Sequence, residues 1–96
     1  MNQSIVEEYR IINHPKNNGN YAVSNLGNVK NIKTNNIKLV GPRGTSRFDD
    51  AQEYSIGRLV ALTFLTIPGV DYSRKKVFHK DGNHFNNHID NLYWKL

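Results

Sequence analysis

The sequence contains no cysteine, which excludes disulfide bonds, thiolate zinc sites and cysteine nucleophiles. Any metal ligand must therefore be a histidine, an aspartate, an asparagine or a carbonyl oxygen. No stretch approaches the roughly 18 consecutive apolar residues of a membrane-spanning helix. The first ten residues, MNQSIVEEYR, also lack the basic region and the apolar run of a signal peptide. We expect a soluble, intracellular protein that does not bind membranes.

Acidic residues are missing from a long part of the chain. Between Tyr9 and Phe48 there are seven lysine or arginine residues and no aspartate or glutamate, in a chain of formal charge +5. Such a segment favours an anionic partner, and double-stranded DNA is the commonest one, because neutralising its phosphates releases condensed counterions. The alternative is a solvated cationic surface that keeps the protein soluble. The oligomeric state stays open, and a homo-oligomer is one alternative.

The 96 residues are enough for one domain with a modest core. Residues 1–40 alternate β-prone pieces with turn residues, which predicts a small, basic, antiparallel β meander. Residues 41–54, including GPRGTSRFDDAQ, have no hydrophobic period and are predicted to form a loop or linker. Within the meander, strands are expected at residues 21–23, 29–32 and 37–40, with turns at 17–20, 25–28 and 34–36.

A helix and a hairpin are predicted over residues 55–96. Ser55 is a candidate N-cap for the helix, and Gly57 weakens the helix by roughly 1 kcal/mol relative to alanine. The pieces RKKVFH and residues 91–96 are the expected hairpin strands, with a turn at residues 81–83. The fold class is therefore α+β. The stretch YSIGRLVALTFL places one apolar face on a helix at 55–65, formed by Ile56, Leu59, Val60 and Phe64. A hydrophobic lid is expected over the hairpin, formed by Phe85, Ile89, Leu92 and Trp94.

Two stretches resemble known sequence patterns. YAVSNLGNVKN, at residues 21–31, resembles the Y-x-V-S-N-x-G-x-V-[RK]-[SN] core of a small modular DNA-binding motif found beside nucleases of mobile elements. GRLVALTFL followed by VFHKDGNHFNNHIDNLYW resembles the HNH homing endonucleases of phage and intron type. Their pattern is H-R-L-V-A-x-x-F, then [DN]-H-x-D-G-x-x-x-[ND]-N-x-x-x-N-L-x-W. The two stretches occur here in the order usual for that family.

This resemblance implies a ββα-metal unit in which a hairpin and a helix hold one divalent ion. His79 occupies the position of the general base that activates water, and Asn91 occupies that of the residue that orients the imidazole. A Mg²⁺ or Mn²⁺ ion would polarise the scissile phosphate if the chain is active. A protein of this kind is expected in the cytoplasm or nucleus of a host cell, or in a virion if it is viral.

The sequence departs from the family pattern at three places. Phe78 precedes the base, where the family has an aspartate or asparagine that binds the metal, and a phenyl ring cannot coordinate a hard cation. The second metal ligand normally lies on a helix about nine residues beyond the Asn91 position, but the sequence ends at Leu96. Gly57 replaces the histidine of H-R-L-V. We therefore expect a degenerate hairpin that lacks the last helix, and no bound cofactor.

Alternatives remain for individual residues. His79 is either a base or a residue that now forms hydrogen bonds within its hairpin, and Asn91 is interpreted as bridging the loop backbone. Asp81 and His84 are the remaining metal-ligand candidates; a zinc site would combine the three hairpin histidines with one aspartate. Contacts to phosphates and base edges are expected from polar residues of the basic segment and the helix, although the meander turns could equally be solvated. The zinc candidates are His79, His84 and His88 with Asp81 or Asp90, and the DNA-binding candidates are Asn25, Asn28, Lys30, Lys33, Lys38, Arg43, Arg47 and Arg58.

Three functions fit these observations. The leading hypothesis is a DNA-binding protein derived from an HNH homing endonuclease, with cleavage lost or impaired. The first alternative is an active, metal-dependent nicking endonuclease that takes its missing ligand from Asp81 or from a partner chain. The second alternative is a virion structural protein or an inhibitor of nucleic-acid enzymes that reuses the fold.

Overall fold

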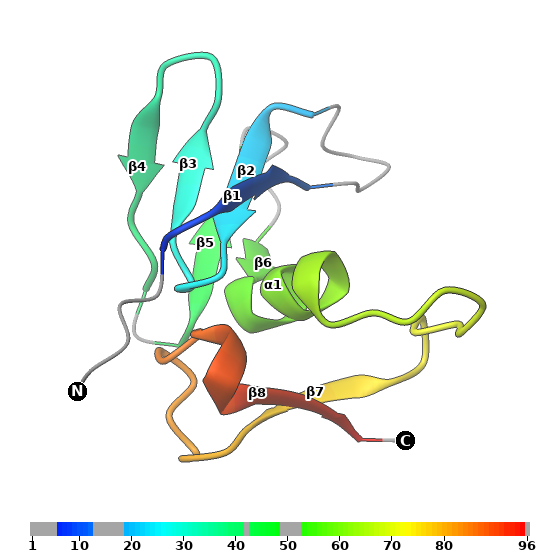
Figure 1. Cartoon of the computed structure of the whole chain (residues 1–96). Coiled ribbons are helices and arrows are strands. Elements are labelled where there is room, and N and C mark those ends of the chain that lie inside the picture. Colours follow the sequence, from blue (N-terminus) through cyan, green and yellow to red (C-terminus); the bar gives the residue numbers. More distant parts are fainter. Residues whose placement is uncertain (1–5, 13–18, 42, 49–52, 96) are drawn as a thin grey trace.

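The computed structural model describes residues 6–12, 19–41, 43–48 and 53–95. A four-stranded antiparallel sheet, which we call the meander sheet, comes first, and its strands lie in chain order (Figure 1). The predicted meander is present, with one strand more than predicted, at its N-terminal edge. Asn17 and Asn18 of the first predicted turn lie outside the described residues. The strands are β1 (Tyr9–Ile11), β2 (Tyr21–Ser24), β3 (Val29–Asn31) and β4 (Asn36–Lys38).

The two tight turns of the meander sheet follow from residues that tolerate a positive φ. Gly27, in the turn between β2 and β3, has a φ of 90°. Asn35, between β3 and β4, has a φ of 59°. Glycine, and to a lesser degree asparagine, adopt this left-handed conformation more readily than other residues. Both turns were predicted from these residue types.

The predicted loop at residues 41–54 contains a second sheet, which corrects that prediction. Strands β5 (Thr45–Arg47) and β6 (Glu53–Ser55) pair antiparallel, with Thr45 opposite Ser55. Their sequences, TSR and EYS, show little apolar alternation, so no strand period could be detected there. The ring of Phe48 stacks on Tyr21 at 4.1 Å and on Tyr54 at 4.7 Å between centroids. Tertiary packing of aromatic rings therefore stabilises this short sheet.

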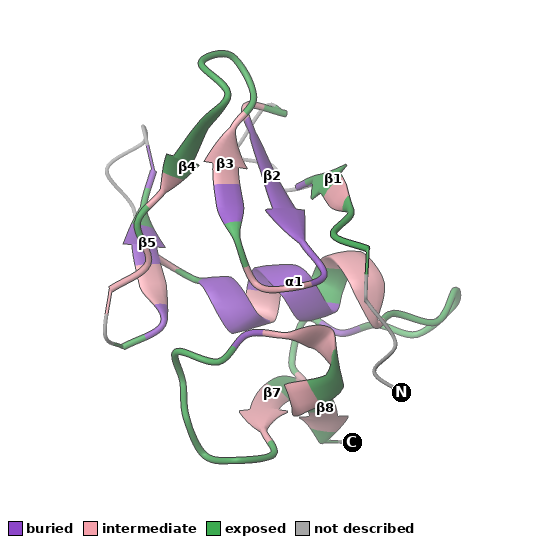
Figure 2. Cartoon of the chain, turned by 60° about the vertical axis from the view of Figure 1, so that its left-hand side comes forward, coloured by how far each residue is buried: buried purple, intermediate pink, exposed green. Residues whose placement is uncertain are grey.

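Helix α1 (Ile56–Phe64) lies between the meander sheet and the C-terminal hairpin (Figure 1). Its apolar face is buried, as predicted, and the burial continues into β2 and the start of β3 (Figure 2). Ser55 occupies the N-cap position with extended backbone, but its side chain makes no capping hydrogen bond. Ser55 is therefore the N-cap by position, but the expected side-chain capping hydrogen bond is wrong. Burial of Ile56, Leu59 and Val60, rather than a cap, positions the helix.

The C-terminal hairpin consists of β7 (Lys76–His79) and β8 (Leu92–Lys95), which pair antiparallel. A short 3₁₀ helix, η1 (Ile89–Asn91), precedes β8, so the second strand begins one residue later than predicted. Leu92 is buried and Ile89 packs against the core. Phe85 is 54% exposed, which corrects its assignment to the hydrophobic lid. Trp94 is half-buried, and its indole N–H donates to the Leu65 carbonyl at 3.1 Å.

One hydrophobic core joins all three segments predicted from the sequence, and the α+β class is confirmed. None of the helices described in the structure is long and apolar enough to cross a membrane. The division at residues 40 and 54 stays a prediction. The buried core residues are Ile12, Tyr21, Val23, Val29, Phe48, Ile56, Leu59, Val60 and Leu92.

Candidate nucleic-acid interface and hairpin site

His79 ends β7 and is held by a buried asparagine that the sequence analysis did not identify. Its Nε2 lies 2.7 Å from the Asn87 Oδ1, and Asn87 is only 3% exposed. An amide oxygen only accepts, so this contact favours Nε2 as the donor, and in a neutral ring Nδ1 then has the lone pair. The Asn87 amide nitrogen is buried without a hydrogen-bond partner among the described residues. The neutral imidazole is therefore held in one tautomer.

Gly57 provides the space for this hydrogen bond. A Cβ on Gly57 would lie 2.8 Å from the Asn87 Oδ1 and 3.1 Å from the His79 Nε2. Such a glycine in a helix often marks a close approach, and this was the available sequence signal. The loop between β7 and η1, which contains Asn87, also passes close to Gly27, where a Cβ would lie 2.8 Å from the Asn87 carbonyl carbon. Asn87 is thus confined from two sides.

Asn91 contacts the loop instead of the imidazole. Its Oδ1 accepts from the Asp81 backbone N–H at 3.1 Å, and its Nδ2 donates to the Asp81 carboxylate and the Asn86 carbonyl, both at 2.9 Å. These are the backbone-bridging contacts expected of Asn91. The resemblance implied that Asn91 orients His79, but the side chain that contacts this ring is that of Asn87. The contact implied for Asn91 is therefore made by Asn87 in this structure.

The Asp81 carboxylate accepts three hydrogen bonds from the same loop. Its Oδ1 accepts from the Asn83 backbone N–H at 2.8 Å and from Asn91, and its Oδ2 accepts from the Asn86 amide at 2.9 Å. These hydrogen bonds, that of Asn86 first, lower the pKa of the exposed Asp81 carboxyl to about 2. The carboxylate therefore organises the turn. A metal ion at Asp81 would compete with these three donors for the carboxylate oxygens.

The position before His79 does not fit a hard cation. The Phe78 ring packs on Tyr93 with centroids 5.7 Å apart, and the Lys95 ammonium lies 5.5 Å from the Phe78 centroid. A divalent cation of the Mg²⁺ class requires oxygen ligands, and this position presents an aromatic ring beside a positive charge. The donor set around His79 therefore does not match the metal site that the resemblance implies.

The hairpin histidines do not converge on a zinc site. The rings of His79 and His84 have centroids 4.9 Å apart, but His88 accepts through Nδ1 from the Asp90 backbone N–H at 3.0 Å. Within residues 6–12, 19–41, 43–48 and 53–95, no three histidine, aspartate or glutamate side chains gather as metal ligands would. The zinc alternative is therefore not supported by the geometry.

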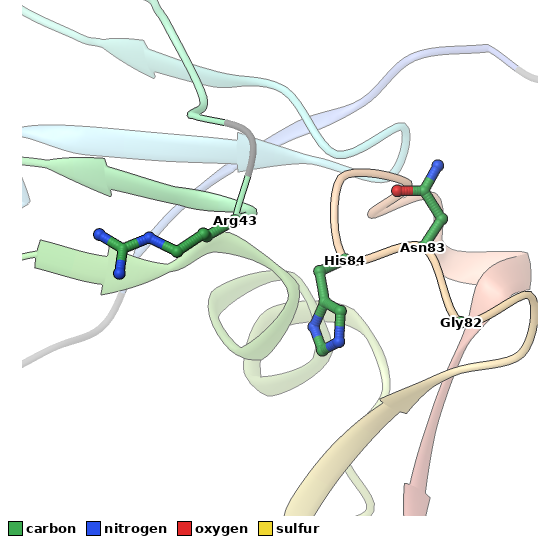
Figure 3. Close-up of a pocket in the computed structure, with 4 residues that line it drawn as sticks. All are labelled: Arg43, Gly82, Asn83 and His84. Atoms are coloured by element: carbon green, nitrogen blue, oxygen red, sulfur yellow. The ribbon is translucent and has the colours of Figure 1, made fainter.

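A shallow pocket of about 510 Å³ lies beside His84 and is lined by Arg43, Gly82, Asn83 and His84. Figure 3 shows that the Arg43 side chain and the Asn83 side chain both extend away from the His84 ring, in different directions. The polar groups of this pocket therefore do not converge on one point.

The lysines of the meander sheet lie on different faces. Lys30 is opposite Ala22 and Ile37 in the strand register, whereas Lys38 is opposite Val29, whose side chain is buried. Because side chains alternate along a strand, Lys30 and Lys38 point to opposite faces. Lys33, in the following turn, is exposed, as are Arg43 and Arg47. The predicted cationic residues are therefore spread around the sheet.

Asn25 is a structural residue, which opposes its predicted role in DNA binding. It is 9% exposed, its Oδ1 accepts from the Glu8 backbone N–H at 2.9 Å, and its Nδ2 donates to the Val6 carbonyl at 3.0 Å. Its own carbonyl accepts from the Ile89 backbone N–H at 3.0 Å. Asn25 therefore joins the segment before β1 to the C-terminal hairpin.

The Arg58 side chain also forms its hydrogen bonds within the protein. Its guanidinium donates to the carbonyls of Lys75 at 2.7 Å, Tyr72 at 3.1 Å and Ser73 at 3.4 Å, and it lies 5.5 Å from the Trp94 ring centroid. These contacts fasten the connection between α1 and β7. They oppose the predicted role of Arg58 in DNA binding.

Comparison with known proteins finds similar sequences and a similar solved structure. No family model matches the chain. Two uncharacterized HNH endonucleases of Acanthamoeba polyphaga mimivirus are 43% and 32% identical in alignments of 82 and 81 residues. These alignments cover 77% and 78% of this chain. The chain spans only 20% and 24% of their lengths.

A solved structure is similar over nearly the whole chain. It describes DNA binding and cleavage by the HNH homing endonuclease I-HmuI, and it matches with a TM-score of 0.67 and 33% identity over 92% of this chain and 52% of that one. The resemblance to HNH homing endonucleases predicted from the sequence is thereby confirmed, as distant homology and as a shared fold.

Proposed function

We propose that this distant homologue of HNH endonucleases is a protein that binds double-stranded DNA and in which metal-dependent cleavage is lost or impaired. Its relatives belong to a class of proteins that bind and cleave DNA. The basic segment between Tyr9 and Phe48 supports binding to a polyanion. The observation that carries the loss of cleavage is the aromatic ring of Phe78 beside His79.

The chemistry of the hairpin supports this proposal. The Phe78 ring offers no oxygen ligand and is packed against Tyr93. The carboxylate of Asp81 already accepts three hydrogen bonds that shape its loop, so a cation bound there would compete with these donors. Cleavage through a hard cation would therefore need donors that the described hairpin does not offer beside His79.

A nicking assay tests the loss of cleavage. Supercoiled plasmid would be incubated with Mg²⁺ or Mn²⁺ and with the parent protein, Phe78→Asp or His79→Ala. We expect no metal-dependent nicking by the parent. Phe78→Leu is the matched control for Phe78→Asp, because it changes the aromatic ring without adding a ligand. Metal-dependent nicking by the parent that disappears in His79→Ala would contradict the proposal.

DNA binding is tested separately by its salt dependence. Several phosphate contacts should lower the affinity for duplex DNA by orders of magnitude between about 50 and 200 mM salt. Equal affinity at both concentrations would exclude the electrostatic mechanism. Binding to unrelated duplex sequences shows how much of the affinity is independent of sequence.

One observation favours an active nicking enzyme as a second candidate. The contact with the Asn87 Oδ1 favours the tautomer in which the His79 Nε2 donates, and in a neutral ring this leaves the Nδ1 lone pair for a general base. An enzyme of this kind requires a metal ligand other than Phe78. The His79→Ala arm of the nicking assay distinguishes the two candidates.

A further inference from the structure

A glutamate side chain lies on the turn between β2 and β3. One carboxylate oxygen of Glu7, Oε2, accepts from the Ser24 hydroxyl at 2.7 Å and from the Asn28 amide at 2.6 Å. The Tyr9 hydroxyl also hydrogen-bonds to this carboxylate, and the charge of Lys30 is close enough to stabilise it. Together with the hydrogen bonds of Asn28 and Ser24, these groups lower the pKa of Glu7.

The donors of this turn are organised before any ligand arrives. The Ser24 Oγ accepts backbone N–H groups from Leu26 at 3.2 Å and from Asn28 at 3.1 Å. A hydroxyl that already accepts twice has only its proton left, so the Ser24 hydroxyl acts as a donor. Ser24 itself is fully buried, which fixes its position. The Lys30 ammonium is held 4.3 Å from the Tyr9 ring centroid. The turn therefore presents two donors and one nearby cation to an anion.

The Glu7 side chain can leave this site without undocking its own segment. Asn25 holds the backbone on both sides of Glu7, through the Val6 carbonyl and the Glu8 N–H. The Asn25 N–H also donates to the Glu8 carbonyl at 3.2 Å. None of these bonds involves the Glu7 carboxylate. Because Glu7 is exposed, rotation of its side chain is enough to open the site.

We propose that Ser24 and Asn28, supported by Lys30, form a binding site for a phosphate group of a nucleic-acid backbone, and that Glu7 occupies this site until DNA displaces it. A carboxylate and a phosphate both accept charge-assisted hydrogen bonds, so the same donors serve either group. Glu7 and Glu8 are the two acids that directly precede the stretch of seven cations without an acid. Glu7 therefore acts as an internal competitor at the edge of the basic segment.

The inference rests on the proposed DNA binding, and paired variants test it. Glu7→Ala empties the site, whereas Glu8→Ala removes the same charge one residue away. Glu8 is a conservative control, because its carboxylate pairs with Arg10 at 2.6 Å and its removal also releases a cation. We expect Glu7→Ala to tighten duplex binding by about tenfold more than Glu8→Ala, as for one gained charge-assisted contact. The salt slope should steepen by about one unit.

Two further variants test whether the gain in DNA affinity depends on this site. Asn28→Ala in the Glu7→Ala background should remove most of the gain, because it deletes one of the two donors. Glu7→Gln keeps an acceptor in place but lacks the charge, and should bind DNA with intermediate affinity. Equal affinities of Glu7→Ala and Glu8→Ala for DNA would overturn the inference and leave DNA binding itself standing.

A second measurement does not depend on DNA. The side-chain amide NMR signals of Asn28 would be followed during titration with inorganic phosphate at constant ionic strength, with chloride as the reference anion. Glu7→Ala should give a saturable shift, and the parent and Glu8→Ala should give little. If duplex binding fails in all variants but this shift is seen, the proposed function is wrong and the anion site stands. Absence of the shift in Glu7→Ala overturns the anion site.

Discussion

Substitution of Gly57 by alanine tests how tightly α1 and the hairpin loop are fitted around His79. The new Cβ would lie 2.8 Å from the Asn87 Oδ1 and 3.2 Å from the His79 Cε1, closer than ordinary van der Waals contact. Asn87 has little room to retreat, because it is 3% exposed and its backbone lies against Gly27. The substitution should therefore displace Asn87 and break its hydrogen bond to His79.

Three effects determine the expected magnitude. Overpacking costs about 1–3 kcal/mol, and a lost buried hydrogen bond costs about 0.5–1.5 kcal/mol. The higher helix propensity of alanine returns up to about 1 kcal/mol. The free energy of unfolding should therefore fall by about 0.5–4.5 kcal/mol. For a domain of this size, each 1 kcal/mol lowers the melting temperature by about 4–8 °C.

Denaturation and NMR together measure this effect. The control is Gly41→Ala, whose Cβ would meet only the Thr45 carbonyl oxygen, at an ordinary 3.5 Å. It should leave stability nearly unchanged. In Gly57→Ala, the ¹⁵N shifts of the His79 ring should show a mixture of tautomers in place of the Nε2-protonated form. A Gly57→Ala variant as stable as the parent, with unchanged His79 shifts, would refute the reasoning.

Three other predictions concern stability, pH and salt. Arg58→Lys keeps the charge but loses the fork of bonds to three carbonyls, so it should lower the free energy of unfolding by about 1–3 kcal/mol, whereas Arg74→Lys at an exposed position should not. Asp81 has its pKa lowered from 3.8 to about 2, so its contribution is complete above about pH 4 and is lost as pH falls through about 2; acid denaturation of the parent should show this dependence and Asp81→Asn should lack it. Lys30→Ala and Lys33→Ala together should flatten the salt slope of DNA binding by roughly two units, and an unchanged slope would place the contact surface elsewhere.

The sequence correctly predicted those elements whose turn residues and apolar pattern match their positions in the folded structure. Asn and Gly at the meander turns, and the apolar face of the helix, indicated the correct types of structure near the correct positions. It missed β5 and β6 because their residues are mostly polar and because Phe48, beside β5, stacks on Tyr21, a ring distant in sequence, as well as on Tyr54. It assigned Arg58 and Asn25 to DNA because both are polar, whereas their partners lie 14–19 residues away. A single sequence carries no local signal for such partners.

The hairpin loop also explains why resemblance to a catalytic motif does not establish catalysis. Asp81 and Asn91 belong to the motif, yet their side chains bond to each other and to the loop backbone, so folding alone is a sufficient reason to keep them. His79 is held by Asn87 through its ring nitrogen, an arrangement compatible with either a base or a structural residue. The position that separates these readings is Phe78, because an oxygen ligand there would serve a cation and would add nothing to the stacking on Tyr93. Activity in this group of proteins should therefore follow the residue before the histidine more closely than it follows the remaining polar residues of the loop.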